Sequence, residues 1–128
     1  MSDKVKQLDS IFSEFVRLRD SAPYGHRMFR CISCGRLLQF EQADAGHFVS
    51  RGNMATRWDE QNVWCECIMC NRMRQDHLVG FRRNLEKKIG VDAVEDLIRR
   101  GHQSVKFSQS ELDEMIAYYK GKIKEMKK

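Results

Sequence analysis

The sequence has 128 residues, the usual size of one compact unit, and it predicts a single domain over residues 1–128 with only a modest core. Lys and Arg number 23 against 18 Asp and Glu, so the formal charge is +5 and the pI is near 9.1, which favours a polyanionic partner: nucleic acid first, an anionic membrane second. No apolar run reaches the roughly 18 residues that span a bilayer, and the first residues lack the apolar core of a signal peptide, which excludes a membrane span and predicts a soluble, cytoplasmic protein.

Helical patterns are predicted at both ends of the chain, around a centre that lacks them. Apolar residues recur every three and four positions over residues 4–20, where Ser2 or Asp3 can cap a helix. Short extended segments follow at about residues 37–40, 46–50 and 62–65. Helical spacing returns after Cys67, with Leu78, Phe81, Leu85 and Ile89 on one face, and ends at Gly90. Residues 91–127 predict two more helices, the second behind a Ser108–Glu111 capping box. The fold class is therefore α+β, with a small centre over about residues 29–90.

Five cysteines, an odd number, indicate metal ligation rather than a closed disulfide framework. Cys31 with Cys34, and Cys67 with Cys70, form two CxxC pairs, and two intervening residues let a tight turn direct both sulfurs at one ion. Four thiolates make a closed tetrahedral site that suits structural zinc. The alternative is four reduced, buried thiols. Cys65 shares a strand face with Cys67, so it could compete for the ion, or it could be a packed thiol.

A second group of polar residues lies between and beside the cysteine pairs. Hydrolysis of a phosphodiester needs a base to activate water, a hard cation and positive charge around the phosphate. Asp44 and Asn71 offer the oxygen ligands that suit Mg²⁺, which leaves His47 free for the water. An Asp-x-x-His sequence alone is more often surface or capping chemistry. Its position between the two cysteine pairs, with Asn62 and Asn71, favours catalysis.

The order of these residues resembles the zinc-containing branch of the HNH, or ββα-metal, nucleases, and in particular the phage junction-resolving endonuclease of that branch. A closer match covers residues 31–90. It includes the strings DAGH at 44–47, SRG at 50–52, RWDEQN at 57–62, CIMCN at 67–71 and KKIG at 87–90, and these are similar to the NinG family of lambdoid phages, also called Rap.

The resemblance implies a metal-dependent endonuclease with an HNH-like ββα centre that cuts branched DNA such as D-loops and Holliday junctions in phage recombination. His47 would be the general base, Asn62 would hold the loop that orients it, and Asp44 and Asn71 would bind a catalytic Mg²⁺ or Mn²⁺. The four paired cysteines would bind the structural zinc. A phage-encoded chain would act in the host cytoplasm. Asn71 stands where the commonest HNH pattern has a histidine, which leaves the identity of the catalytic metal open.

Basic residues near these motifs are candidates for DNA contact. Arg51 and Arg57 could clamp phosphate or simply be solvated. A further group around the second cysteine pair could follow a DNA backbone: Arg72, Arg74, Arg82 and Arg83, with Lys87 and Lys88.

Two rival functions and the oligomeric state stay open at this point. A non-catalytic zinc module that binds nucleic acid would need the cysteines and arginines but not Asp44, His47 and Asn71 together. An HNH enzyme that cuts linear duplex is the other alternative. Symmetric cuts in a four-way junction would suit a homodimer, and the apolar stripe of the last helix could either pair two subunits or dock on its own core.

Overall fold

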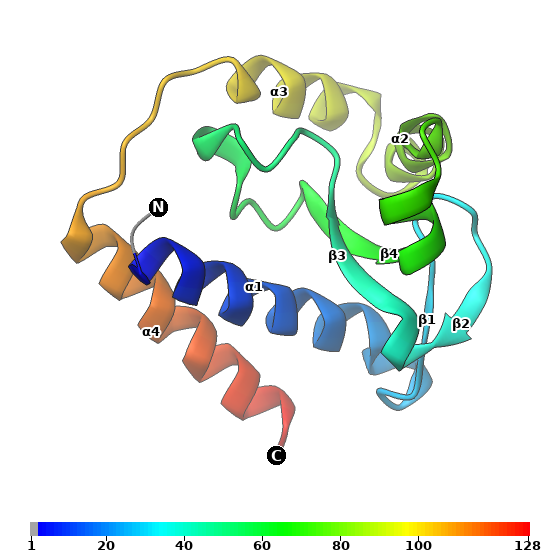
Figure 1. The fold of residues 1–128 in the computed structure, drawn as a ribbon, viewed down its shortest axis with the longest axis horizontal. Coiled ribbons are helices and arrows are strands. Elements are labelled where there is room, and N and C mark those ends of the chain that lie inside the picture. Colours follow the sequence, from blue (N-terminus) through cyan, green and yellow to red (C-terminus); the bar gives the residue numbers. More distant parts are fainter. Residues whose placement is uncertain (1–2) are drawn as a thin grey trace.

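The computed structural model describes residues 3–128 as a mixed α+β fold, as the sequence predicted (Figure 1). Two pairs of short antiparallel strands lie at its centre, β1 with β2 and β3 with β4. The elements are α1 (Asp3–Ser21), β1 (Met28–Arg30), β2 (Leu37–Gln39), β3 (Ala43–His47), β4 (Val63–Cys67), a π-helical turn (Met69–Met73), α2 (His77–Ile89), α3 (Val91–Gly101) and α4 (Gln109–Met126). No helix within residues 3–128 is long and apolar enough to cross a membrane.

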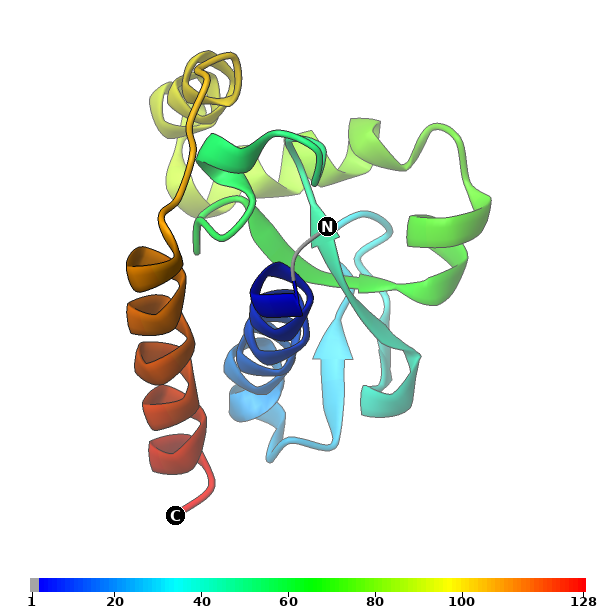
Figure 2. The same ribbon diagram turned by 60° about the vertical axis from the view of Figure 1, so that its left-hand side comes forward.

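The first and last helices pack side by side, and α1 lies between α4 and the β3–β4 hairpin (Figures 1 and 2). Phe12 of α1 meets Tyr119 of α4 edge-on, with ring centroids 4.9 Å apart. The predicted capping box is present, because Ser108 Oγ accepts from the Glu111 N–H at 3.0 Å and the Glu111 carboxylate accepts from the Ser108 N–H at 2.9 Å. The contact between Phe12 and Tyr119 shows that the apolar stripe of α4 docks on the core of its own chain. Ser2, one of the two predicted caps of the first helix, lies outside the described residues, and Asp3 is the first residue of α1.

A second, smaller core lies on the other side of the hairpin, under α2 and α3 (Figure 2). Its fully buried members are Phe81 and Leu85 of α2 and Val94 and Leu97 of α3. Helix α2 comes very close to the first cysteine turn, since a Cβ at Gly80 would lie only 2.2 Å from the Ser33 carbonyl oxygen. A glycine is needed at that position for α2 to pack there.

The strands differ from their predicted positions in an informative way. Strand β3 ends at His47, three residues before the predicted end, because the Asn62 side chain takes the place of a strand partner at Val49. Its Oδ1 accepts from the Val49 N–H at 2.8 Å and its Nδ2 donates to the Val49 carbonyl at 3.0 Å. Strand β1 was not predicted, since three residues are too few to show an alternating pattern.

Candidate metal centre and neighbouring cavity

The two predicted cysteine pairs come together in the fold. The turn after β1 carries Cys31 and Cys34, while the end of β4 and the π-helical turn carry Cys67 and Cys70. The four Sγ atoms all lie within 4.8 Å of one another. Tetrahedral zinc with Zn–S bonds near 2.3 Å requires sulfurs about 3.8 Å apart, so the cluster fits such an ion with small adjustments. The four cysteines can thus bind a metal such as zinc.

Backbone hydrogen bonds to sulfur support the same interpretation. The Cys34 and Cys67 N–H groups donate to Cys31 Sγ at 3.4 and 3.3 Å, and the Cys70 N–H donates to Cys67 Sγ at 3.4 Å. Burial raises the pKa of the Cys31 thiol. Burial also opposes ionisation of Cys34, but hydrogen bonds from Arg36 and from neighbouring cysteines outweigh it and lower the Cys34 pKa to about 7. Cys34 is therefore more readily available as a thiolate than Cys31.

Cys65 does not belong to this cluster. It lies two residues before Cys67 on β4, but its Sγ faces the Val16 carbonyl of α1 at 3.9 Å, and burial raises the pKa of its thiol. Its backbone N–H donates to the Asp20 carboxylate at 2.8 Å. Of the two roles left open by the sequence, the structure assigns Cys65 that of a packed thiol.

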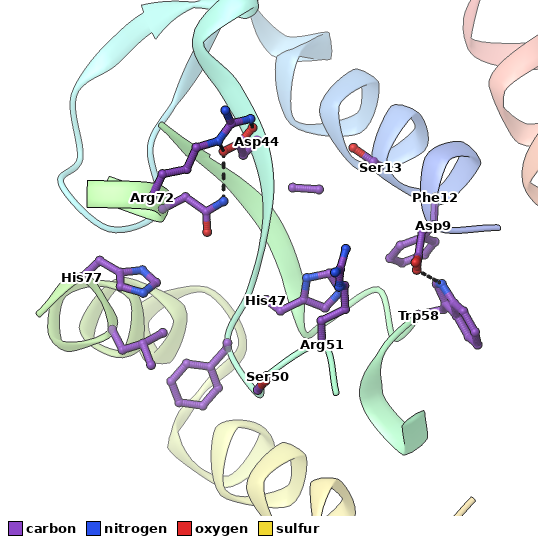
Figure 3. A pocket seen from close by; sticks show the side chains of 14 residues that line it. Asp9, Phe12, Ser13, Asp44, His47, Ser50, Arg51, Trp58, Arg72 and His77 are labelled. Atoms are coloured by element: carbon purple, nitrogen blue, oxygen red, sulfur yellow. Dashed lines mark hydrogen bonds and ion pairs between the residues drawn. The ribbon is translucent and has the colours of Figure 1, made fainter. Parts of the chain in front are cut away.

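A cavity of about 510 Å³ lies beside the cluster, between α1, β3 and the start of α2 (Figure 3). Its lining is rich in charged and polar side chains. Three predicted site residues, Asp44, His47 and Asn71, all face it. The other ionisable side chains of the lining are Asp9, Arg51, Arg72 and His77.

Asp44 and Asn71 are in direct contact within this cavity. Asn71 Nδ2 donates to Asp44 Oδ2 at 2.9 Å, and among residues 3–128 the Asn71 carboxamide oxygen has no hydrogen-bond partner. The Arg72 guanidinium binds both Asp44 oxygens, each at 2.9 Å, with 61% of its side chain exposed. An exposed ion pair contributes about 1 kcal/mol or less, so a divalent cation can compete for Asp44. A carboxylate and an amide oxygen are ligands that suit Mg²⁺ or Mn²⁺.

His47 approaches the cavity from the opposite face of β3, since residues an odd number of positions apart alternate along a strand. Its Nε2 lies 2.9 Å from the Arg57 carbonyl oxygen. A carbonyl only accepts, so Nε2 carries the hydrogen and Nδ1 keeps the lone pair. Burial lowers the His47 pKa, and the Arg57 carbonyl opposes that effect only in part. A lowered pKa favours the neutral form of the imidazole at pH 7.

Asn62 lies outside the cavity and is fully buried. Besides its two hydrogen bonds to Val49, its Nδ2 donates to the Thr56 carbonyl at 3.0 Å. Asn62 thereby closes the loop between β3 and β4. Because Thr56 immediately precedes Arg57, this loop also places the carbonyl that His47 binds.

The predicted DNA-binding arginines divide into one buried and five exposed residues. Arg57 is only 4% exposed, and its guanidinium pairs with Asp9 at 2.5 and 3.0 Å, so it has no surface to offer a phosphate and stabilises the loop instead. The other predicted arginines are exposed, from the cavity rim to the outer face of α2: Arg51, Arg72, Arg74, Arg82 and Arg83.

Two residues that the sequence did not single out lie next to the predicted ones. Glu66 of β4 is fully buried, pairs with Asp44 across the hairpin, and holds His77 Nδ1 at 2.5 Å through its Oε2. The Ser33 hydroxyl donates to the same oxygen. His77 belongs to no sequence motif, so nothing in the sequence indicated it. Glu66 could have been found from the strand pairing, because it is a charged residue opposite Asp44.

These features define a small α+β domain built on a four-cysteine knuckle, with a polar cavity beside it. The chain belongs to the NinG family, because the family described as "Bacteriophage Lambda NinG protein" matches residues 1–128. This confirms the resemblance seen in the sequence at the level of the NinG family.

Curated proteins of several phages are similar to the chain over most of its length. It is 32% identical over 124 residues to the ninG proteins of Salmonella phage P22, Escherichia phage 933W and Escherichia phage lambda, which covers 96% of this chain and 57, 58 and 57% of those proteins. The chain thus spans little more than half the length of these relatives. No solved structure is significantly similar to it.

Proposed function

We propose that this protein is a metal-dependent DNA endonuclease of the HNH type that acts on branched recombination intermediates. The observation that carries the proposal is the shared cavity, which brings the Asp44–Asn71 pair and the imidazole of His47 to one polar surface beside the four-cysteine cluster. A neutral imidazole with a free lone pair, next to oxygen ligands for a hard cation, is the equipment that phosphodiester hydrolysis requires.

In the proposed mechanism, His47 Nδ1 accepts a proton from a water molecule that attacks the scissile phosphorus. Asp44 and Asn71 would hold the divalent ion, which supplies positive charge for the departing 3′ oxygen. The Arg57 carbonyl fixes the imidazole through Nε2. The products would carry 5′-phosphate and 3′-hydroxyl ends, as the resemblance to HNH enzymes implies.

The exposed arginines support DNA as the partner. Arg51 and Arg72 are at the cavity, and Arg74, Arg82 and Arg83 extend from the π-helical turn along α2. Positive charge in this arrangement favours a phosphate backbone that passes over the cavity. Branch selectivity is part of the proposal through the family resemblance.

The test compares cleavage of linear, forked and four-way DNA by the zinc-loaded protein with Mg²⁺ or Mn²⁺. The wild type should cut branched substrates in preference to linear duplex. His47→Ala should lower the rate by about 10²-fold to 10⁴-fold, because it removes the base. His102→Ala, at an exposed histidine outside the cavity, is the matched control and should cut normally.

Three outcomes would contradict the proposal in different ways. A wild-type rate for His47→Ala with zinc still bound would refute the assignment of the base. No cutting of any substrate would favour the non-catalytic nucleic-acid-binding module. Equal cutting of linear and branched DNA would favour an HNH nuclease that acts on linear duplex.

A further inference from the structure

Glu66 and His77 form a buried pair that the proposed mechanism does not use. Glu66 is 0% exposed, and its Oε2 is 2.5 Å from His77 Nδ1. Its Oε1 is buried and lacks a hydrogen-bond partner among residues 3–128. A buried carboxylate oxygen without a hydrogen-bond partner destabilises the folded protein, so packing alone does not account for Glu66 at this position.

The surrounding backbone is shaped to admit this carboxylate. A Cβ at position 46 would lie 2.4 Å from Glu66 Oε1 and 2.9 Å from its Cβ, so only the glycine found there leaves room. The Ser33 hydroxyl, from the first cysteine turn, also donates to Oε2. Glu66 is thus bound by Ser33 and His77 through Oε2, in a space that Gly46 leaves open.

The other ring nitrogen of His77, Nε2, is not used by Glu66. His77 lines the same cavity as Asp44 and Asn71, and Figure 3 shows its ring extending from the start of α2 toward β3. Within the described part of the chain, Nε2 has no hydrogen-bond partner. With the Nδ1 hydrogen directed at the carboxylate, Nε2 is the ring nitrogen that is left to bind a metal.

The hairpin brings this imidazole toward the Asp44–Asn71 pair. Asp44 and Glu66 are direct partners across β3 and β4, so their side chains leave the same face of the hairpin with Cβ atoms about 5 Å apart. Each carboxylate then binds one side chain from the segment that follows β4: Asp44 binds Asn71, and Glu66 binds His77.

We propose that His77 Nε2 is a third protein ligand of the divalent cation assigned to Asp44 and Asn71, with Glu66 as its positioning residue; this inference rests on the proposed function. A metal-binding histidine characteristically donates its second ring N–H to a carboxylate, which is the arrangement seen here. An imidazole ligand makes the site better suited to Mn²⁺ than to Mg²⁺, because Mg²⁺ prefers oxygen ligands alone.

The test measures Mn²⁺ binding to the zinc-loaded full chain without DNA, with electron paramagnetic resonance as the detection method. His77→Asn keeps an N–H donor near Glu66 but places no nitrogen at the position of Nε2, and it should raise the Mn²⁺ dissociation constant by about 10-fold to 100-fold. His102→Asn is the matched control and should bind as the wild type does.

A second readout guards against a variant that fails to fold. In the wild-type protein, bound Mn²⁺ should broaden the imidazole resonances of His77 beyond detection and leave those of His102 sharp. Unchanged Mn²⁺ affinity in folded His77→Asn, or sharp His77 resonances with Mn²⁺ bound, would overturn the inference. Mn²⁺ binding that depends on His77, without cleavage of any DNA, would support the metal ligand and refute the nuclease instead.

Discussion

The four-cysteine cluster and the polar cavity are built from the same short stretch of chain, but they are opposite in character. Cys67 and Cys70 contribute their sulfurs to the mostly buried four-cysteine cluster, whereas their neighbours Glu66 and Asn71 bind His77 and Asp44, which line the cavity. The cluster is mostly buried, while the cavity is open and rich in charged side chains. A metal bound by the cluster would fix the backbone that positions the cavity residues. A substitution in the cluster should therefore disrupt the cavity, whereas a substitution in the cavity should leave the cluster intact.

Removal of one cluster sulfur is expected to have the largest effect on metal content and stability. Cys67→Ala should release the zinc and unfold the centre of the domain, because structural zinc contributes on the order of 10 kcal/mol to folding in small zinc modules. Cys65→Ala is a stringent control, since Cys65 is equally buried on the same strand but outside the cluster. It should keep one zinc per chain and melt within a few degrees of the wild type.

Elemental analysis and thermal melting followed by circular dichroism measure both effects. If Cys65→Ala lost the ion and Cys67→Ala kept it, the ligand set would be wrong. If neither variant changed its metal content, the cluster would not hold zinc at all.

The same contrast explains what the sequence could predict. The CxxC spacing is a local pattern, so it predicts the four clustered cysteines. The long helices are equally predictable, because their apolar periodicity covers many residues. Three features depend on side-chain contacts that no local sequence pattern shows: the end of β3, the burial of Arg57 and the Glu66–His77 pair. The sequence predicted that Arg57 contacts phosphate or solvent, because its actual partner, Asp9, is 48 residues away on α1.

The side of the cavity that holds His47 can be weakened without touching the cluster. Asn62→Ala should destabilise the protein by about 3 kcal/mol, because it leaves the partly buried backbone groups of Val49 and the buried carbonyl of Thr56 without partners. Zinc content should stay at one per chain. Urea denaturation gives the stability, and loss of DNA cleavage alongside retained zinc would show that the loop positions His47.

Asn53→Ala is the matched control on the same loop. Asn53 Nδ2 donates to the Ser50 carbonyl at 3.1 Å in an exposed position, so its loss should cost less than about 1 kcal/mol. Equal destabilisation by the two substitutions would contradict a special role for Asn62.

The smallest expected effect is electrostatic and acts on His47 alone. The positive charge of Arg51 lowers the His47 pKa, after the larger contribution of burial. Arg51→Gln should therefore raise that pKa, which a nuclear magnetic resonance titration of the imidazole would record. A base must be neutral to accept a proton, so the acidic limb of the cleavage profile should move to higher pH by the same amount.

Arg83→Gln removes an exposed arginine that does not line the cavity and should leave the His47 pKa in place. An unchanged or lower pKa in Arg51→Gln would show that Arg51 does not face the imidazole in solution, and a moved pKa with an unmoved cleavage profile would remove His47 from the role of base.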